Sequence, residues 1–330
     1  MLQSETYYRE APKVTVFLFA YNQERFIEAA CRSVLTQDYD KPMQIVFSDD
    51  CSQDDTFAIM TAIAEGYEGI HTLSLNRNSK NLGLINHVNL SYKLSTGDLI
   101  IAAAGDDISS PNRVTENVKA FRLSEKLPMS LYSAVYEMSE SGEVGQVRKP
   151  PYTKPPAIKA CATSASIVIG AAHAWHRNVF DTFGDITELG AYEDLVIAYR
   201  SALLDGLVYI DLPLIAYRLD VGISQVINGS EENLDDMSIY RGRIRRYTNI
   251  MLPVLAQRLK DSLLINDKDA YVIDLIKKEI LKQEVDYKII VEENNLIELL
   301  LNSKNPITKL LLIKAGSKVA IRKAQQLLKN

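Results

Sequence analysis

Two aspartates stand side by side directly after a small apolar run, in the stretch AAAGDDISSP that covers residues 102–111. The run is typical of a buried strand, so Asp106 and Asp107 are expected where that strand ends. Two adjacent carboxylates repel each other, and a nearby cation favours their charged form. Hard divalent ions such as Mg²⁺ and Mn²⁺ prefer oxygen ligands and often keep substrate phosphates in their shell. The pair therefore indicates a metal site at the edge of a sheet.

Two further polar clusters follow apolar runs in the same way. Tyr21 and Asn22 follow the run VTVFLFA at residues 14–20, and Asp49 and Asp50 end the run QIVFSDD. In an open parallel sheet, ligands bind outside the carboxyl ends of the strands. We therefore expect the three clusters to converge on one sheet edge, where the chemistry of the protein should lie.

The elements that must position these clusters alternate between strand and helix patterns. Predicted strands cover residues 14–20, 43–50, 71–76 and 98–107, with helices between them at 27–35, 52–66 and 82–97. Such alternation predicts a parallel, doubly wound α/β sheet with right-handed crossovers. Beyond residue 125 we predict strands at 129–139 and 207–219, a proline-containing loop or lid at 139–159, a helix at 192–206 and a helical remainder from about residue 231.

The composition is that of an ordinary globular protein: 47% of the 330 residues are hydrophobic, 24% are charged, and the net charge is −5. That net charge gives no indication of nucleic-acid binding. The three cysteines lie far apart, which argues against a disulfide framework or a zinc site and for a reducing compartment. We expect a cytoplasmic protein, since no secretory signal is visible and the longest apolar runs are shorter than the roughly 20 residues of a membrane span.

Several segments, taken in order, resemble those of the inverting family 2 glycosyltransferases, whose catalytic domain has the GT-A fold. They are the run from Pro12 to Asp40, then IVFSDDCSQDDT, NLGL, TGDLIIAAAGDD and YED. The resemblance covers residues 12 to 225 and predicts a GT-A catalytic domain at 1–225, followed by a C-terminal helical region at 226–330. It implies a nucleotide-sugar donor, a Mn²⁺ or Mg²⁺ ion on the donor diphosphate, and direct displacement at the anomeric carbon.

The resemblance further implies a UDP- or dTDP-sugar as donor and a glycan or lipid-linked saccharide as acceptor, in the synthesis of a cell-surface polysaccharide. Processive relatives carry several membrane spans and a QxxRW motif. Neither is visible in this sequence, so a non-processive transferase is expected.

Within that framework, the strand-end residues take roles in donor binding. The ring of Tyr21, beside Asn22, offers a face on which a base can stack, worth about 1–3 kcal/mol. Asp50 can accept a hydrogen bond from the N3–H group of uracil or thymine. Asp49 and Asp54 serve the ribose or cap the helix that follows, because aspartate is also a preferred cap residue.

Asn81 and Gly83 lie where a loop enters the next helix. Both residue types tolerate left-handed backbone, so we expect a turn there with backbone N–H groups left free. Many family members have an arginine later in this helix, and the matching stretch of this chain has His87 instead. The side chain of His87 is expected to face solvent or the core.

The metal motif of the family consists of two aspartates that flank one residue, and here Ala104 takes the first place. Asp106 followed by Asp107 resembles the variant in which the second aspartate binds the metal, although Asp107 alone also fits a helix cap. Asp220 stands where the family has a histidine on the metal or diphosphate, and a carboxylate suits the same hard cation. Arg218 is expected to bind phosphate or to form a surface salt bridge.

The acidic pair Glu193–Asp194 stands where the family places its general base, which takes the proton of the acceptor hydroxyl. Asp194 is the predicted base, and Glu193 the residue that orients its neighbours or the acceptor. A carboxylate in the first turn of a helix also suits the helix dipole, so a capping role is the alternative. Trp175 and His176 lie where the family lines its acceptor pocket, although Trp175 equally suits the core.

Two other functions are compatible with this fold. A sugar nucleotidyltransferase usually has a Gly-rich, basic loop after the first strand, and the corresponding FAYNQERF contains no glycine. The other alternative is a GT-A domain that has lost activity and only binds partners, which Ala104 and Asp220 leave open.

The end of the chain, residues 304–330, carries seven basic residues and no acid. As a helix, its apolar side gathers Leu310, Ile313, Ala320, Ile321, Ala324, Leu327 and Leu328. A basic amphipathic helix can lie in the headgroup region of an anionic membrane, which brings an enzyme to a lipid-linked acceptor. The alternative is a helix that packs on the acidic surface of the catalytic domain or in an oligomer contact.

Overall fold

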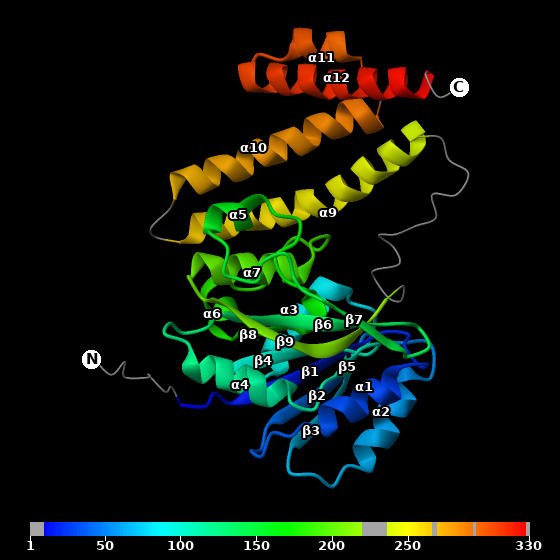
Figure 1. Ribbon diagram of the computed structural model, residues 1–330, viewed down its shortest axis with the longest axis vertical. Helices are drawn as coiled ribbons and strands as arrows, with labels where there is room; N and C mark the ends of the chain where they lie inside the picture. Colours follow the sequence, from blue (N-terminus) through cyan, green and yellow to red (C-terminus); the bar gives the residue numbers. More distant parts are fainter. Residues whose placement is uncertain (1–9, 220–235, 266–268, 293–294, 328–330) are drawn as a thin grey trace.

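A computed structural model of the chain describes residues 10–219, 236–265, 269–292 and 295–327. A nine-stranded sheet runs through the protein, with helices on both faces and a further layer of helices above one face (Figure 1). The strands lie in the order β3-β2-β1-β4-β8-β6-β9-β5, and β7 pairs with β6.

The first half of the sheet is parallel, as the sequence predicts. Its strands are β1 (Val14–Ala20), β2 (Gln44–Asp49), β3 (Thr72–Arg77) and β4 (Leu99–Ala104). The crossover helices are α1 (Ile27–Leu35), α2 (Thr56–Glu65) and α3 (Leu84–Leu94). Because β1 pairs with β2 on one side and with β4 on the other, almost all of its residues are buried.

Two hydrophobic cores lie on the opposite faces of this sheet. Alternate residues of β1 divide between them: Val16 and Leu18 face α1, α2 and α4 (Arg113–Leu123), whereas Phe17 faces α3 and α7 (Glu193–Leu203). The sheet is therefore covered on both faces, which explains why its central strands read as continuous apolar runs.

The second half of the sheet, for which the sequence predicts strands without a direction, is mixed. Strand β8 (His173–His176) is antiparallel to β4 and to β6 (Ser130–Met138), whereas β6 is parallel to β9 (Leu207–Arg218). The two-residue β5 (Ile108–Ser109) is antiparallel to β9. An apolar run buried on both faces looks the same in either orientation, so the sequence pattern could not distinguish them.

The segment predicted as a loop or lid, residues 139–159, is only partly a loop. It contains β7 (Val144–Arg148), which pairs antiparallel with β6, and its end enters α5 (Ile158–Thr163). The prediction was wrong for β7, because the strand is largely exposed and is defined by its backbone pairing with β6 rather than by an apolar pattern.

Beyond β9 the described chain is helical, as predicted. The helices are α9 (Asp236–Leu264), α10 (Ala270–Asp286), the π-helical turn η2 (Tyr287–Val291), α11 (Leu296–Asn302) and α12 (Pro306–Leu327). Val254 and Leu255 of α9 and Ile276 of α10 share one core with Trp175 of β8. The predicted domain boundary at residue 225 lies outside the described residues, and α9 and α10 extend the core of the sheet.

Helix α12 packs on the other C-terminal helices rather than on the sheet. Leu312 and Ala315 are buried against Val285 and Ile290, and Lys318 forms an ion pair with Asp286. Leu310 and Ile313, which the sequence places on the apolar side of this helix, are 53% and 52% exposed. The side chains from residue 320 onward lie outside the described part.

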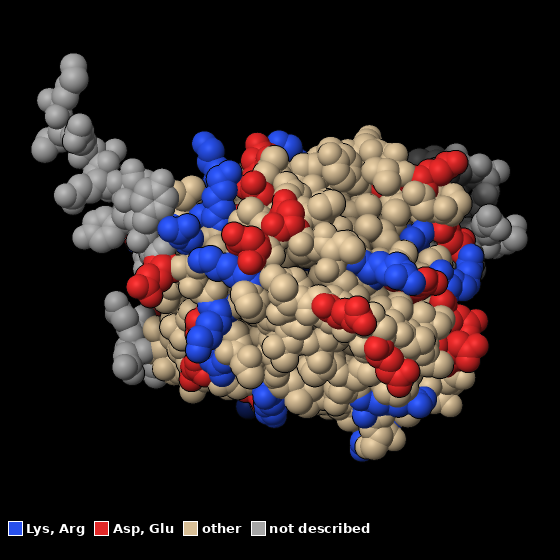
Figure 2. Space-filling model, turned by 90° about the horizontal axis from the view of Figure 1, so that it is seen from below, with Lys and Arg blue, Asp and Glu red and all other residues tan. Residues whose placement is uncertain are grey.

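The described surface has two features that bear on partners. Acidic and basic side chains are interspersed on the face seen from below, opposite the C-terminal helices (Figure 2). Among the helices of the described ranges, none has the length and apolar character needed to cross a membrane.

A buried ion pair joins α9 to the catalytic half. The Nε and Nη2 atoms of Arg200 in α7 donate to Asp261 of α9 at 2.9 and 3.1 Å, and both side chains are about fully buried. Gln257 donates a further hydrogen bond of 2.9 Å to Asp261. The two charges are thus paired and hydrogen-bonded, which is the condition under which buried charges are tolerated.

Asp261→Ala should lower the free energy of unfolding by about 3–5 kcal/mol, because it leaves the Arg200 cation buried without its partner. Urea denaturation followed by circular dichroism measures this loss. Lys126→Ala is the matched control, since it removes an ion pair with Asp205 that lies at the surface. Equal midpoints for the two variants would contradict the structural role of the buried pair.

Candidate active site

The ends of β1, β2 and β4 meet at one sheet edge, as the sequence predicts. In the strand register, Ala20 lies beside Asp49 and Phe19 beside Ala104. The pairing continues one residue further, because the N–H of Asp50 donates to the carbonyl of Ala20 and the N–H of Gly105 to that of Phe19, both at 2.9 Å. The polar clusters that follow these three strands therefore begin at the same position along the strand direction.

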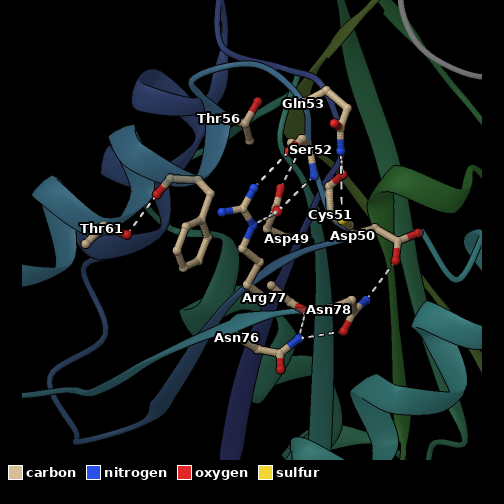
Figure 3. Close-up of polar contacts among 12 residues, drawn as sticks. Asp49, Asp50, Cys51, Ser52, Gln53, Thr56, Thr61, Asn76, Arg77 and Asn78 are labelled. Carbon is tan, nitrogen blue, oxygen red and sulfur yellow. Dashed lines mark hydrogen bonds and ion pairs between the residues drawn. The ribbon is translucent and has the colours of Figure 1, made fainter. Parts of the chain in front are cut away.

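Asp49 shapes the turn after β2. Its side chain is fully buried, its Oδ2 atom accepts the N–H of Ser52 at 3.0 Å, and Oδ1 accepts the Ser52 hydroxyl (Figure 3). The Nε atom of Arg77 lies 3.4 Å from the same carboxylate, and the guanidinium also covers the ring of Phe57. Of the two roles considered for Asp49, these contacts favour the structural one.

Asp50 holds the loop that enters α3. One of its oxygens accepts hydrogen bonds from Asn78 and from the N–H of Leu82, both at 2.8 Å, and the other accepts the N–H of Gly83 at 3.0 Å. The predicted turn is present, since Gly83 has φ +76° and Asn81 accepts its N–H at 2.8 Å. The expectation of free N–H groups was wrong, because Asp50 takes those of both Leu82 and Gly83.

Tyr21 and Asn22 behave differently although they are neighbours. The ring of Tyr21 is 44% exposed, which leaves a face open to a ligand. Asn22 has φ 52°, and its side-chain oxygen accepts the N–H of Gln53 at 2.9 Å while its own N–H donates to Ser52. Asn22 thus ties the end of β1 to the turn after β2, and Tyr21 is the better placed of the two for stacking.

His87 faces the core. Its Nε2 atom lies 2.6 Å from the hydroxyl of Ser48, and its ring edge contacts Phe17 and Phe19. Burial lowers the pKa of His87, although the charges of Asp50 and Asp49 oppose that shift. A neutral, hydrogen-bonded histidine therefore fills the place of the family's arginine.

Asp107 is buried and Asp106 is half-buried. Burial raises the pKa of Asp107 well above its usual range, and the charge of Asp106 adds to this, against the N–H of Arg218 and the charges of Arg113 and Arg218. Burial also raises the pKa of Asp106, opposed by Gln23 among others. A divalent cation beside this pair would favour the ionised form of both carboxylates, so the chemistry of the donor set fits such an ion.

The two aspartates differ in what they leave available. Asp107 Oδ1 accepts the N–H of Arg218 at 2.8 Å, so this carboxylate already fastens the start of the loop to the end of β9. Asp106 is the more accessible ligand. Within the described ranges, no group of three or more His, Cys, Asp or Glu side chains is arranged to hold a metal, and Asp220 lies outside those ranges.

Arg218 links backbone segments around this loop. Its Nε donates to the carbonyl of Asp106 at 3.0 Å, and its Nη1 donates to the carbonyls of Ser139 and Glu140 at 2.9 and 2.7 Å. The guanidinium also lies 4.4 Å from the ring centre of Phe26. A surface salt bridge does not describe this buried side chain, and its visible contacts position the loop of Asp106. Phosphate binding by Arg218 stays a prediction.

The acid pair opens α7. Asp194 Oδ1 accepts the N–H of Leu195 at 2.7 Å, and Gly170 packs against both acids. Burial, followed by the charge of Asp194, raises the pKa of Glu193 to about 8. Burial raises the pKa of Asp194 to about 6, against the N–H of Leu195 and the charge of Arg258. Near neutral pH the two carboxyls therefore hold about one proton between them.

The capping alternative fits both acids, because backbone N–H groups of the first turn of α7 lower the pKa of each carboxyl against the effect of burial. Gly170 leaves room beside the two acids. A Cβ atom at Gly170 would lie 3.2 Å from a carboxylate oxygen of Glu193 and 3.3 Å from Asp194 Oδ2. Trp175, by contrast, is 1% exposed and belongs to the core, as does the adjacent β8 backbone.

The sequence patterns did not identify three residues of this site. Gln23 receives the N–H of Tyr21 at 3.3 Å, Gly170 lies against the acids, and Arg258 of α9 reaches the first turn of α7. The glutamine stands in the strand-end cluster and could have been found there. Nothing local marks Gly170 or Arg258, because they approach the site only through the tertiary fold.

The model of the family described as "Glycosyl transferase family 2" matches residues 15–184, which is just over half of the chain. The chain belongs to glycosyl transferase family 2. The matched region contains the strand-end clusters of β1, β2 and β4 and ends before Glu193.

Relatives of known sequence are described as glycosyltransferases. A Bacillus subtilis (strain 168) protein named as glycosyltransferase EpsE is 37% identical over 108 residues, 32% of this chain and 37% of its own length. A glycosyltransferase of Haemophilus influenzae is 27% identical over 139 residues, 42% of each chain. The chain thus matches less than half the length of these relatives.

Solved structures agree on the fold. S. aureus TarS (residues 1–349, with UDP-GlcNAc) superposes with a TM-score of 0.58 at 16% identity, over 92% of this chain and 79% of that one. The mannosyltransferase PcManGT of Pyrobaculum calidifontis (with GDP-Man and Mn²⁺) gives 0.54 at 17% identity, over 96% and 83%. The expected GT-A fold with added C-terminal helices is confirmed.

Proposed function

We propose that the protein is a metal-assisted, inverting, non-processive glycosyltransferase that moves a sugar from a UDP- or dTDP-sugar to a hydroxyl of a glycan or lipid-linked saccharide, in the synthesis of a cell-surface polysaccharide. The observation that carries the proposal is the register of β1, β2 and β4. This register brings Tyr21, Asp50 and Asp106 to one edge of the sheet. The chain belongs to a family of glycosyl transferases, and ligands of open α/β sheets bind at this edge.

Donor binding is proposed for the edge formed by β1 and β2. The exposed ring of Tyr21 supports stacking of a base. Asp50 supports recognition of an N3–H group, because its Oδ2 accepts one visible hydrogen bond and an oxygen of a carboxylate can accept two. TarS with UDP-GlcNAc and PcManGT with GDP-Man support a nucleoside diphosphate sugar as the class of donor.

Asp106 is proposed to bind a Mn²⁺ or Mg²⁺ ion. Asp107 and Asp220 are further candidate ligands of this ion. The ion supplies charge that stabilises the departing nucleoside diphosphate. Arg218 holds the carbonyl of Asp106, so it fixes the loop that presents the carboxylate. The Mn²⁺ ion named with PcManGT supports a divalent metal in a neighbour of the same fold.

The acid pair is proposed to serve the acceptor. Asp194, ionised near neutral pH, takes the proton of the attacking hydroxyl as the new glycosidic bond forms on the face opposite the leaving diphosphate. Glu193 retains its proton and can donate a hydrogen bond that orients the acceptor. Displacement from the opposite face inverts the anomeric configuration.

UDP, dTDP and GDP should be compared in a thermal-shift screen with and without Mn²⁺. UDP or dTDP with Mn²⁺ should raise the melting temperature, because a bound nucleotide and ion stabilise the folded state. Asp106→Ala should remove the Mn²⁺ dependence and abolish turnover, whereas Asp38→Ala, which changes an exposed residue of the connection between α1 and β2, should retain both. The donor assignment would be wrong if neither UDP nor dTDP gave a Mn²⁺-dependent shift in the melting temperature of the parent protein.

Asp194→Asn should keep nucleotide binding and lose transfer by about 10²-fold or more, because only the proton acceptor is removed. In the parent protein the rate should rise as the pH increases through about 6, since the base works only after losing its proton. A pH profile of product formation checks both points. Weaker nucleotide binding with an unchanged chemical rate in Asp194→Asn would move the base elsewhere.

We also propose that the start of α12 contacts the inner face of an anionic membrane. Ile307, Leu310 and Ile313 are each about half exposed, on a helix at the far end of the molecule from α1 and α2 (Figure 1). Lys304, Lys309 and Lys314 are exposed beside them. Basic residues near an anionic surface contribute about 1 kcal/mol each, and the apolar side chains add a term for burial.

The double variant Leu310→Glu with Ile313→Glu should reduce cosedimentation with phosphatidylglycerol vesicles by about tenfold or more at low salt, because it removes apolar burial and adds negative charge. Ile70→Glu is the matched control, since Ile70 is 62% exposed on the α2–β3 connection. Vesicle binding that is absent in the parent protein, or equal in the variant, would disprove the membrane contact.

A further inference from the structure

Helix α9 is fastened to the segment that carries the acid pair at several points along its length. Pro253 packs against Gly190, and Gln257 accepts the N–H groups of Thr187 and Glu188 at 2.9 and 3.1 Å. Further along, Asp261 forms the buried ion pair with Arg200. The loop before the acids and the helix after them are therefore both held from α9.

Arg258 of α9 contacts the backbone next to the acids. The side chain is fully buried, and its Nη2 donates to the carbonyl of Leu195 at 3.0 Å, with Nε at 3.4 Å from the same oxygen. Its Nη1 donates to the carbonyls of Ala162 and Ser164 at the end of α5, at 3.3 and 2.9 Å. Leu195 directly follows Asp194, so the guanidinium fixes the backbone beside the acid.

A buried guanidinium needs a compensating anion, and carbonyl oxygens supply only partial charge. Among the described residues, no carboxylate lies within ion-pair distance of Arg258. Asp194 is the carboxylate whose charge favours the charged form of the Arg258 guanidinium. The interaction is mutual, because the charge of Arg258 also favours the ionised form of Asp194.

We propose that Arg258 is a positioning residue for catalysis: it fixes the first turn of α7 through the carbonyl of Leu195 and adds a positive charge to the buried surroundings of Asp194. The inference rests on the proposed role of Asp194 as the base. It extends the machinery into a helix that lies beyond the part of the chain matched by the family.

The charged and titratable groups around Asp194 come from two elements. On α7 they are Glu193, whose charge would oppose ionisation of Asp194, and Tyr192 just before it. From α9 comes Arg258. Cys161 of α5, with Tyr199 of α7 and Tyr247 of α9, acts on Arg258 rather than on Asp194. Arg258 is thus the cation whose charge favours the ionised form of Asp194.

The test is a carbon-13 NMR titration of the full chain labelled at the aspartate carboxyl carbons, with the Asp194 signal assigned by its loss in Asp194→Asn. Arg258→Gln keeps donors for the carbonyls and removes the charge. It should raise the pKa of Asp194 from about 6 to about 7 or higher. Arg258→Lys keeps the charge and loses only the planar fork, so the pKa of Asp194 should stay near its parent value.

Val254→Ala is the matched control, because it perturbs the buried face of the same helix without changing a charge. It should leave the titration of Asp194 unchanged. If Arg258→Gln does not fold, Arg258→Met provides a second neutral variant. An Asp194 carboxyl that titrates alike in the parent protein and in a folded neutral variant overturns the proposal, as does an equal shift in Arg258→Lys.

The titration needs no donor or acceptor, so its outcome is separate from that of the proposed function. If Asp194→Asn abolishes transfer while the neutral Arg258 variants titrate normally, only the role of Arg258 fails. If Asp194→Asn retains full transfer, the base assignment fails whatever the titration shows.

Discussion

Buried carboxylates at the carboxyl end of a parallel sheet are the constraint on which the rest of this structure depends. A carboxylate removed from water must be given hydrogen-bond donors. Asp49 takes donors from Ser52, Asp50 from the entrance of α3, and Asp107 from the end of β9. Each aspartate thereby pins a loop at the sheet edge. The loops that face a donor are consequently held rigid by the same type of residue that could bind it.

This constraint divides neighbouring acids between two tasks. Asp49 and Asp107 are buried and already bonded to the protein, whereas Asp106 is only half-buried. After β4, the fixed Asp107 sets the geometry of the loop, and the more open Asp106 is left for a ligand. The acid pair on α7 differs from these clusters, because its two carboxyls hold about one proton between them around neutral pH.

Much of the fold could be predicted from the sequence because its signals are local. The strand β1 begins and ends where the apolar run does, and the polar residues after β1, β2 and β4 mark the edge. The features that could not be predicted depend on contacts between residues that lie far apart in the sequence. Arg218 meets Asp107 across 111 residues and Arg258 meets Leu195 across 63, and neither contact leaves a periodic pattern. The reversed direction of β8 and the pairing of β7 were missed for the same reason.

The shared core of β8, α9 and α10 has a consequence for how the chain is made. Trp175 contacts the cluster that includes Leu255 and Ile276, so the face of the sheet under α7 cannot close until those residues have left the ribosome. Contacts that far apart in sequence form slowly, and apolar surface stays uncovered in the interval. The nascent chain therefore passes through a stage in which the strands of the sheet have been made but one face of the sheet lacks its cover.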